Sequence, residues 1–526
     1  MTFTDFDKTN AYAALARIAP DYQRGGFFAA LDGARVRSCA VPMAAGIAYN
    51  YAAKKVDRPV LDCLQQLADE TGCTGKFKLL LHGETMNTGE QRKVLHHLAR
   101  GQLGSDVVWN GKNLGAFYHA ESERFFQFAA DVHAGKITGS GGKRFTTAVQ
   151  IGIGGSDLGP RALYIALENW ARKEGAARLQ ARFISNVDPD DAAAVLAPLD
   201  LAATVFILVS KSGTTQETLA NELFVKDKLN KAGLDLAKHM VAVTSETSPL
   251  AHNSAYLDSF YIDDFIGGRY SATSGVGGVI LSLAFGPDVF RAILAGAHAA
   301  DATALEDSIL KNPALLDALI GVWERNFLGY PYTAILPYSQ ALARFPAHLQ
   351  QLDMESNGKC VNRDGKRVNY ATGPVVFGEP GTNGQHSFYQ LLHQGTDIVP
   401  LQFIGFTQSQ LGDDVEVDGS TSQTKLKANL AAQIVAFAKG KADANRNKNF
   451  EGERPASVIY GKKLEPAALG ALLAHFENKV MFQGFVWNLN SFDQEGVQLG
   501  KILTKQALSG KSGDSALDEY CALLGV

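Results

Sequence analysis

Six short stretches of the chain combine small, polar and charged residues in ways that could do chemistry. The most informative is Thr204–Thr218, TVFILVSKSGTTQET. Its apolar first part, Thr204–Val209, predicts a strand buried on both faces, and Thr214-x-x-Glu217 matches a capping box at the start of a helix. Free N–H groups, the positive end of the helix dipole and several hydroxyls would then converge, which favours an anion such as a phosphate. A turn that merely caps its helix fits the same residues, and no Walker loop is present to indicate nucleotide hydrolysis.

A second glycine-rich stretch, Ile151–Pro160 (IGIGGSDLGP), partly matches a dinucleotide-binding fingerprint. Asp157 stands where the fingerprint needs its third glycine, and a carboxylate there would repel a pyrophosphate, so NAD binding is disfavoured. Gly154 and Gly155 instead permit close approach of the backbone to a ligand, and Ser156 offers a hydroxyl. A tight turn followed by a helix cap explains the loop equally well.

Two further stretches offer a cation and a carboxylate. Arg269 lies in Ile266–Ser271, after an expected strand, where it could meet developing negative charge or form an ordinary surface ion pair. Gln351 and Glu355 are four residues apart, so a helix would place them on one face, with Glu355 beside the Ser-Asn-Gly turn that follows. A solvated glutamate is the common alternative.

The last two stretches add a histidine and a polar helix face. The loop Gly378–Phe388 delivers His386 to the expected first turn of a helix, where the dipole favours the neutral imidazole. His393 shares that face, but no carboxylate or cysteine stands at a zinc spacing, so we expect no metal site. Gln494 and Lys501 are seven residues apart on another helix face, for which a solvated surface is the default explanation.

The whole chain has 526 residues, 46% of them hydrophobic, and a net charge of −4, which gives no electrostatic case for nucleic acid or an anionic membrane. Its five cysteines are odd in number and form no C-x-x-C pair, so a reducing compartment is expected rather than a disulfide framework. The N-terminus shows no signal peptide and no apolar run is long enough to span a bilayer. These features predict a soluble, cytoplasmic protein.

The order of apolar segments predicts an α/β protein with two mainly parallel sheets flanked by helices. Residues 1–118 are expected to be a helical region packed on the larger domain, with helices at Val60–Glu70 and Glu90–Leu103. Residues 119–286 form the predicted first, smaller α/β domain, 287–510 the second and larger one, and 511–526 a helical tail. We expect strands at Thr147–Ile153, Arg182–Val187, Thr204–Val209, Met240–Thr244, Phe260–Asp264, Thr333–Leu336, Pro374–Phe377, Ile398–Phe406 and Ser457–Tyr460. The two halves could be related folds.

The six stretches, taken in order, resemble the signatures of the glucose-6-phosphate isomerase (phosphoglucose isomerase) family. The matching sequences are GIGGSDLGP, SKSGTTQET, GGRYS, MESNGK, GEPGTNGQHSF and SFDQEGVQLGK, together with NTGEQRKVLHHLAR at 87–100. The resemblance spans nearly the whole chain. It implies two sugar-isomerase (SIS) domains, a homodimer, no metal or organic cofactor, and isomerisation of D-glucose 6-phosphate to D-fructose 6-phosphate in glycolysis and gluconeogenesis.

The resemblance also implies a role for each matching residue. Glu355 would be the base that moves a proton between C2 and C1, and Arg269 would face the enediolate. His386, supplied by the partner subunit, and Lys501 would assist ring opening. Substrate-binding roles are implied for Gly155, Ser156, Ser210, Lys211, Ser212, Thr215, Gln351 and Gln494.

Three departures from the family pattern bear on the shape of the pocket. Ala272-Thr273 stands where many members have Leu-Trp, Glu495 replaces a usual aromatic residue, and Ser212-Gly213 replaces a bulkier pair, which predicts a looser phosphate loop. The alternatives are a related sugar-phosphate or amino-sugar-phosphate isomerase, and a non-catalytic sugar-phosphate sensor of the same fold. A sensor would not need Glu355, His386 and Lys501 together.

Overall fold

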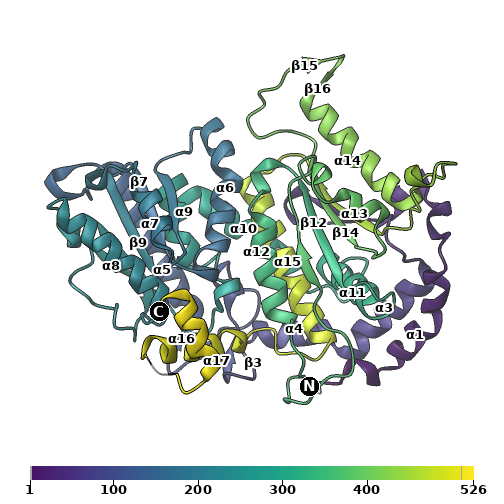
Figure 1. Ribbon diagram of the computed structural model, residues 1–526, viewed down its shortest axis with the longest axis horizontal. Helices are drawn as coiled ribbons and strands as arrows, with labels where there is room; N and C mark the ends of the chain where they lie inside the picture. Colours follow the sequence, from purple (N-terminus) through teal and green to yellow (C-terminus); the bar gives the residue numbers. More distant parts are fainter. Residues whose placement is uncertain (1–2, 511) are drawn as a thin grey trace.

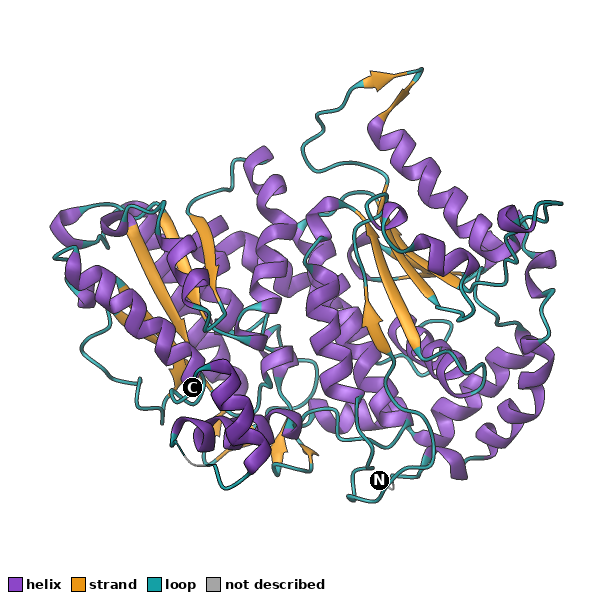
Figure 2. Cartoon of the chain, in the orientation of Figure 1, coloured by secondary structure: helices purple, strands orange, loops and turns teal. Residues whose placement is uncertain are grey.

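Two sheets, each covered by helices, lie side by side along the longest axis of the molecule (Figures 1 and 2). The structure is a computed structural model that describes residues 3–510 and 512–526. Residues 1 and 2 of the predicted segment 1–118 and residue 511 of the predicted segment 511–526 therefore lie outside the described residues. Helices α10 (Pro287–Thr303), α12 (Phe345–Gln350) and α15 (Pro466–Val486) run between the sheets (Figure 1). The predicted fold class is confirmed.

The first sheet has five strands, all parallel, in the order β11-β10-β9-β7-β8. Its strands are β7 (Thr147–Ile151), β8 (Gln180–Ile184), β9 (Thr204–Val209), β10 (Met240–Ser245) and β11 (Asp258–Ile262). Each strand overlaps its predicted range, and β9 matches it at both ends. Since every residue of β9 is buried, the prediction of a strand covered on both faces is confirmed.

Alternate residues of β9 face two different sets of helices, as the period of a strand requires. Val205, Ile207 and Val209 join the main core with α5 (Leu114–Ala134), α6 (Leu158–Lys173) and α9 (Gly275–Phe285). Phe206 and Leu208 join a separate core under α7 (Pro189–Leu196) and α8 (Gln216–Lys231). Packing on both faces fixes the position of the loop that follows the strand.

The second sheet has six strands in the order β1-β2-β17-β14-β12-β13. Four of them are parallel to one another, namely β12 (Tyr332–Tyr338), β13 (Val375–Phe377), β14 (Leu401–Phe406) and β17 (Ala456–Gly461). Their order, β17-β14-β12-β13, repeats the order β10-β9-β7-β8 of the first sheet. The shared topology supports the expectation that the halves are related folds.

The N-terminal region is less helical than its sequence predicts. Helix α3 (Arg58–Thr71) contains the predicted Val60–Glu70, but β1 (Ala40–Pro42) and β2 (Ala48–Asn50) extend the second sheet in antiparallel fashion at β17. Strands of three residues are too short to show a period in the sequence.

The helix predicted at Glu90–Leu103 is wrong. This segment forms β4 (Arg92–Lys93) and a 3-10 turn, η4 (His96–Ala99). The backbone N–H of Leu95 donates to the carbonyl of Phe265, and both histidines of the turn are buried. Tertiary contacts therefore override the helical pattern.

The remaining helices flank the second sheet or end the chain. They include α1 (Asn10–Gln23), α4 (Cys73–Leu81), α11 (Pro313–Asn326), α13 (Tyr389–Gln394), α14 (Ser422–Lys439), α16 (Gln498–Leu508) and α17 (Ser515–Leu524). A hairpin, β15 (Glu416–Val417) with β16 (Ser420–Thr421), projects at the start of α14 (Figure 1). Within the described residues, no helix is both long and apolar enough to cross a bilayer.

Candidate active site

The loops after β7 and β9 lie next to each other because these two strands pair in parallel, with Thr147 opposite Thr204. From β7 the chain turns to β8 on one side and then returns to β9 on the other. Their shared carboxyl end is thus a topological switch point, where open α/β sheets bind ligands.

The hydroxyls of the loop after β9 bond chiefly to one another. Ser210 Oγ donates to Thr215 Oγ1 at 3.3 Å, and Thr214 Oγ1 donates to Ser212 Oγ at 2.9 Å. The predicted capping box at Thr214 is wrong, because α8 begins at Gln216 and its N-cap residue is Thr215. Neither threonine side chain caps the helix, so these hydroxyls are held by bonds that a ligand could replace.

The same loop is anchored on both sides. Gly213 has a φ of +66°, and a Cβ there would lie 2.2 Å from Ser248 Oγ, so the glycine is closely packed and the loop is not loose at this position. Lys211 Nζ donates to the carbonyl of Ile266 at 3.3 Å and lies 3.8 Å from Asp264. Burial lowers the pKa of Lys211, with Asp264 opposing the shift. Through Lys211 the loop reaches the segment that carries Arg269.

The turns η6 (Gly154–Ser156) and η9 (Gly268–Tyr270) touch through their backbones. A Cβ on Gly155 would lie 2.2 Å from the carbonyl of Gly268, so only glycine fits. A Cβ on Gly154 would lie 3.2 Å from Gln351 Nε2, which places that amide against the same turn. Asp157, directly after η6, is buried, and its carboxylate accepts a hydrogen bond from Arg161 Nε at 2.7 Å.

Arg269 is buried and held by bonds from three directions. Its Nε donates to Ser356 Oγ at 2.7 Å, and its Nη2 donates to the carbonyls of Ser491 at 2.5 Å and Asp493 at 2.9 Å. Its Nη1 lies 3.4 Å from Glu355 Oε2. A guanidinium fixed in this way presents its remaining edge to the carboxylate without being free to move.

Glu355 ends a π-helical turn, η11 (Gln351–Glu355), that continues α12. The predicted helix is thus present, and its last turn has the wider π geometry, which is rare and often occurs at functional sites. Gln351 Oε1 and Glu355 Oε2 are buried and find no hydrogen-bond partner within the described part of the chain. Glu355 Oε2 has only its ion pair with Arg269, at 3.4 Å. Since buried polar atoms normally have hydrogen-bond partners, these two oxygens indicate a place for a ligand that donates to them.

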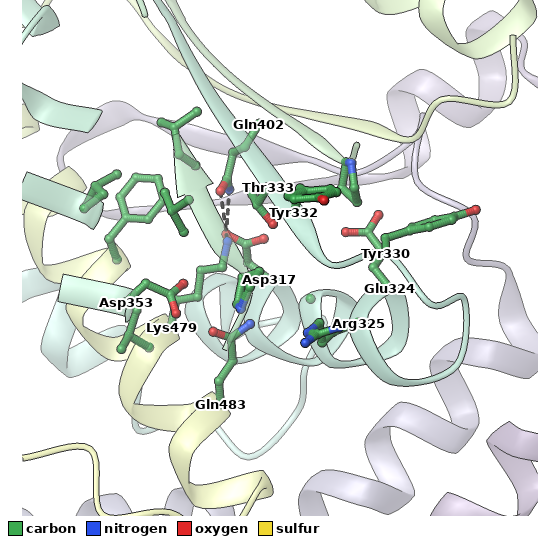
Figure 3. Close-up of a pocket in the computed structure, with 18 of the residues that line it drawn as sticks. Asp317, Glu324, Arg325, Tyr330, Tyr332, Thr333, Asp353, Gln402, Lys479 and Gln483 are labelled. Atoms are coloured by element: carbon green, nitrogen blue, oxygen red, sulfur yellow. Dashed lines mark hydrogen bonds and ion pairs between the residues drawn. The ribbon is translucent and has the colours of Figure 1, made fainter. Parts of the chain in front are cut away.

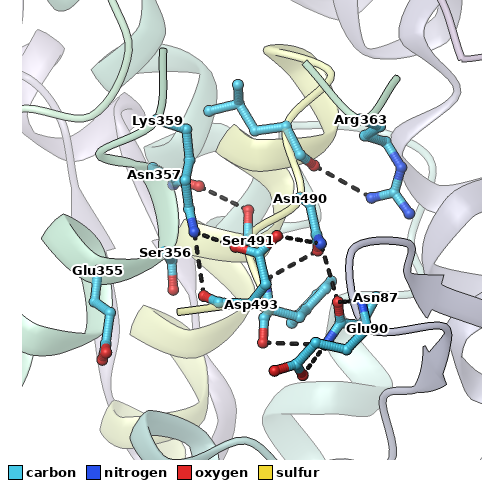
Figure 4. A network of polar contacts seen from close by, with 12 residues as sticks. Asn87, Glu90, Glu355, Ser356, Asn357, Lys359, Arg363, Asn490, Ser491 and Asp493 are labelled. Atoms are coloured by element: carbon cyan, nitrogen blue, oxygen red, sulfur yellow. Dashed lines mark hydrogen bonds and ion pairs between the residues drawn. The ribbon is translucent and has the colours of Figure 1, made fainter. Parts of the chain in front are cut away.

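A polar network holds the segment Asn490–Gln494 beside this turn (Figure 4). Asp493 forms an ion pair with Lys359 and accepts from Asn490 Nδ2 at 2.6 Å. Asn490 also donates to Asn87 Oδ1 at 2.9 Å, which ties in the N-terminal region. Gln494 itself is exposed, directly after the residue whose carbonyl binds Arg269.

Several members of this network were not singled out from the sequence. They are Asn87, Ser356, Asn357, Lys359, Asn490, Ser491 and Asp493. All of them lie inside or beside the family motifs, and this position in the sequence is the one feature that could have pointed to them. Their supporting function needs contacts between segments far apart in the chain, which no single stretch can show.

His386 and Lys501 are not joined to this cluster. His386 is exposed in the 3-10 turn η12 (Gly384–His386), and α13 starts only at Tyr389, so it does not lie in the first turn of that helix as predicted. Lys501 is exposed on α16, which packs on η14 (Glu495–Val497) and α17. Neither side chain forms a hydrogen bond or ion pair with Arg269 or Glu355 in the described residues.

The departures at Ala272 and Thr273 have structural partners. Thr273 Oγ1 accepts from Arg100 Nε at 3.1 Å, and Arg100 is buried in ion pairs with Asp301 and Glu477. A Cβ on Gly159 would lie 2.8 Å from that of Ala272, so this position is closely packed. Glu495, the third departure, is exposed.

No group of three or more histidine, cysteine, aspartate or glutamate side chains in the described residues could hold a metal ion. The arrangement is instead that of proton-transfer chemistry. A carboxylate that accepts no hydrogen bond at its buried oxygen lies 3.4 Å from a fixed guanidinium, on the segment that the hydroxyl-rich loop contacts through Lys211.

Comparison with known proteins agrees with this chemistry. The family model described as "Phosphoglucose isomerase" matches residues 50–522. A glucose-6-phosphate isomerase from Treponema denticola is 65% identical over 475 residues, covering 90% of each chain. One from Borreliella burgdorferi is 47% identical over 525 residues, covering 99% of this chain and 98% of the relative.

A solved structure is similar over nearly the full length. The crystal structure of a glucose-6-phosphate isomerase from Chlamydia trachomatis is 42% identical, with a TM-score of 0.91, and each chain covers 99% of the other. With the family model matching most of the sequence, the chain belongs to the phosphoglucose isomerase family.

Proposed function

We propose that this chain catalyses the reversible isomerisation of D-glucose 6-phosphate and D-fructose 6-phosphate. The observation that carries the proposal is the ion pair of Glu355 Oε2, a buried oxygen without a hydrogen-bond donor in the described residues, with the fixed guanidinium of Arg269. The reaction is a step of glycolysis and gluconeogenesis, for which we propose the cytoplasm as the location. It needs a base at carbon and a cation for the intermediate, and this pair can supply both.

The phosphate would be bound by the loop after β9. Ser210, Ser212 and Thr215 offer hydroxyls, and Lys211 supplies an ammonium that is already turned toward the neighbouring segment. The N-terminus of α8 adds its dipole. This binding leaves the phosphate unchanged and orients the reacting carbons.

The sugar would lie between the loop after β7 and the π turn. The backbone of Gly155, packed on Gly268, and the hydroxyl of Ser156 would line one side, and Gln351 would offer its unpaired carbonyl oxygen on the other. Gln494, next to Asp493, would complete this lining.

Proton transfer would use Glu355 and Arg269 together. The Glu355 carboxylate takes a proton from C2 of the open-chain aldose, which leaves an enediolate. As Glu355 returns this proton to C1, the O2 hydroxyl proton passes to O1, so that C2 becomes the ketone carbonyl and O1 a hydroxyl. The Arg269 guanidinium stabilises the negative charge on the enediolate oxygens and is too weak an acid to quench it. The three anchors on Arg269 keep the cation in place throughout.

Ring opening precedes this step and needs a donor and an acceptor at O1 and O5. We propose His386 and Lys501 for it, with His386 supplied by the partner in a homodimer. Supporting this, His386 is exposed on its own subunit and bonds to no other candidate side chain in the described residues. The neighbouring Gln385 donates to Asn429 at 2.7 Å, which holds the loop at the surface.

A coupled assay of the purified protein with fructose 6-phosphate, with and without a chelator, tests the proposal. We expect turnover that the chelator does not change. Binding of the sugar phosphate without turnover would indicate a sensor, and activity lost with chelator would refute the metal-free chemistry.

A further inference from the structure

A small polar cavity lies against the π turn η11, and none of the proposed catalytic or substrate-binding residues lines it (Figure 3). It has a volume of about 30 Å³ and is enclosed by α11, α15, η11 and the amino ends of the second sheet's strands. A space of roughly 10–15 Å³ holds one water molecule, so this cavity has room for about two. Its lining includes the carboxyl of Asp353, the central residue of the turn that carries Gln351 and Glu355.

Asp353 is 8% exposed, and no hydrogen bond in the described structure includes its carboxyl. Its Oδ1 is fully enclosed and unpaired. Gln483 on α15 lines the same cavity, and its Oε1 is also buried and unpaired. Two acceptors facing one polar space require a donor between them.

Each of the other carboxylates at the cavity already has its own cation, whereas Asp353 has none at ion-pair distance in the described residues. Lys479 Nζ lies 3.1 Å from Asp317 Oδ2 and donates to Gln402 Oε1 at 2.9 Å. Lys54 pairs with Glu324 at 3.0 Å on the other side. Arg325, the remaining cation, lies away from Asp353 in Figure 3, and its Nε donates to Thr372 O at 2.8 Å. The charged groups that face the cavity are therefore Lys54, Asp317, Glu324, Arg325 and Lys479.

An ionised Asp353 would thus be buried without a counter-ion of its own, which is unfavourable. Burial raises the pKa of Asp353 to about 7, with Lys479 opposing the shift and Asp317 adding to it. As a neutral acid the carboxyl gains an O–H donor, which is the group that the cavity needs.

We propose that Asp353 is a positioning residue for the proposed base: as a neutral carboxylic acid it donates, through ordered water in the cavity, to Gln483 and so fixes the turn that carries Glu355. The π turn would then be held at two points, by the ion pair of Glu355 with Arg269 and by the water-mediated bond of Asp353 in the cavity. The inference depends on the proposed function of Glu355.

The kinetic test compares Asp353→Asn with Asp353→Ala. The amide keeps a neutral donor of the same shape, so kcat should stay near that of the wild type. The alanine variant releases the turn, and kcat should fall by about 10-fold to 100-fold with little change in KM. Gln483→Met removes the acceptor. In the double variant with Asp353→Ala, kcat should fall by less than the product of the two single effects, because both variants break the same bond. Thr333→Val changes the same cavity from β12 and is the matched control.

A second measurement needs no activity. A carboxyl with a raised folded pKa stabilises the fold fully below the unfolded value of 3.8, and this contribution is lost as pH rises through about 7. The Tm of Asp353→Asn relative to the wild type should therefore increase between pH 4 and pH 7 and then level off.

A constant Tm difference over this range, or equal loss of kcat in both Asp353 variants, would overturn the inference. An active wild type with an inactive Glu355→Gln variant but an unaffected Asp353→Ala variant would refute the positioning function alone. If the wild type has no isomerase activity, the proposed function itself fails.

Discussion

The two parallel sheets share the order of four strands but differ in the loops at their carboxyl ends. After β9, the hydroxyls of Ser210, Ser212, Thr214 and Thr215 bond to one another. Both loops bond to the next strand of their sheet through the backbone, since the N–H of Ser210 donates to Val243 O and that of Thr407 to Gly461 O. In the loop after β14, the Thr407 hydroxyl donates to the backbone carbonyl of Lys462 at 3.2 Å instead of to another hydroxyl. Topology thus offers two equivalent places for a ligand, and the chemistry of the loops favours one of them.

The second sheet contributes to the proposed site in another way. Its helices α12 and α15 lead into the π turn with Glu355 and the segment with Asp493. One half would therefore bind the phosphate and the other would supply the base. Comparing variants in the phosphate loop of the first half with variants around Glu355 in the second half tests this division of labour.

Glu355→Gln should cause the largest effect. Removing the base should lower kcat by about 10²-fold to 10⁴-fold while the sugar phosphate still binds. Steady-state kinetics and calorimetric binding measure the two quantities. Glu495→Gln, at an exposed position nearby, is the control, and near-normal turnover of Glu355→Gln would contradict the assignment.

Ser210→Ala combined with Thr215→Ala should act on substrate binding. Each lost bond to a charged group costs about 1.5–3 kcal/mol, so KM should rise by at least about tenfold with a smaller change in kcat. Thr407→Ala in the loop of the second sheet should leave KM unchanged. A large fall in kcat at constant KM would mean that the loop does more than anchor the phosphate.

Gly155→Ala should destabilise the contact between the turns η6 and η9. The new Cβ would meet the backbone of Gly268, which cannot move aside like a flexible side chain, so we expect a loss of about 1–3 kcal/mol in the free energy of unfolding. Denaturant titration measures it. Gly500→Ala on α16 meets no atom within 4 Å, and since alanine is the better helix former it should be neutral to slightly stabilising. Equal stability of the two variants would argue against a tight junction.

Ser356→Ala should have the smallest effect. It removes one of the anchors of Arg269 and the contact with the Tyr270 hydroxyl at 3.1 Å, while both backbone acceptors remain. The lost bond has a charged donor and would contribute about 1.5–3 kcal/mol, but the two carbonyls still hold the guanidinium, so kcat should fall by no more than about tenfold. If Ser356→Ala matched Glu355→Gln, Ser356 would have a direct part in the chemistry.

Much of the fold could be predicted from apolar patterning. The strand β9 and the alternation around it follow from uninterrupted β-branched runs, which few other structures accommodate. The predictions failed at β1 and β2, which are too short to show a period, and at Glu90–Leu103, where burial of His96 and His97 outweighed helical spacing. The capping box at Thr214 failed because its hydroxyl found a nearer partner in Ser212.

The sequence by itself determined which residue types are available for the chemistry and which family the motifs resemble, because those depend on identity and spacing alone. Only the tertiary structure decided which of them meet. Arg269 and Glu355 are 86 positions apart, and their contact exists because the two sheets and their helices pack around a shared core that brings η9 and η11 together. The burial of Asp353 without an ion-pair partner in the described residues was likewise invisible in the sequence, since burial and charge pairing arise only when distant segments pack.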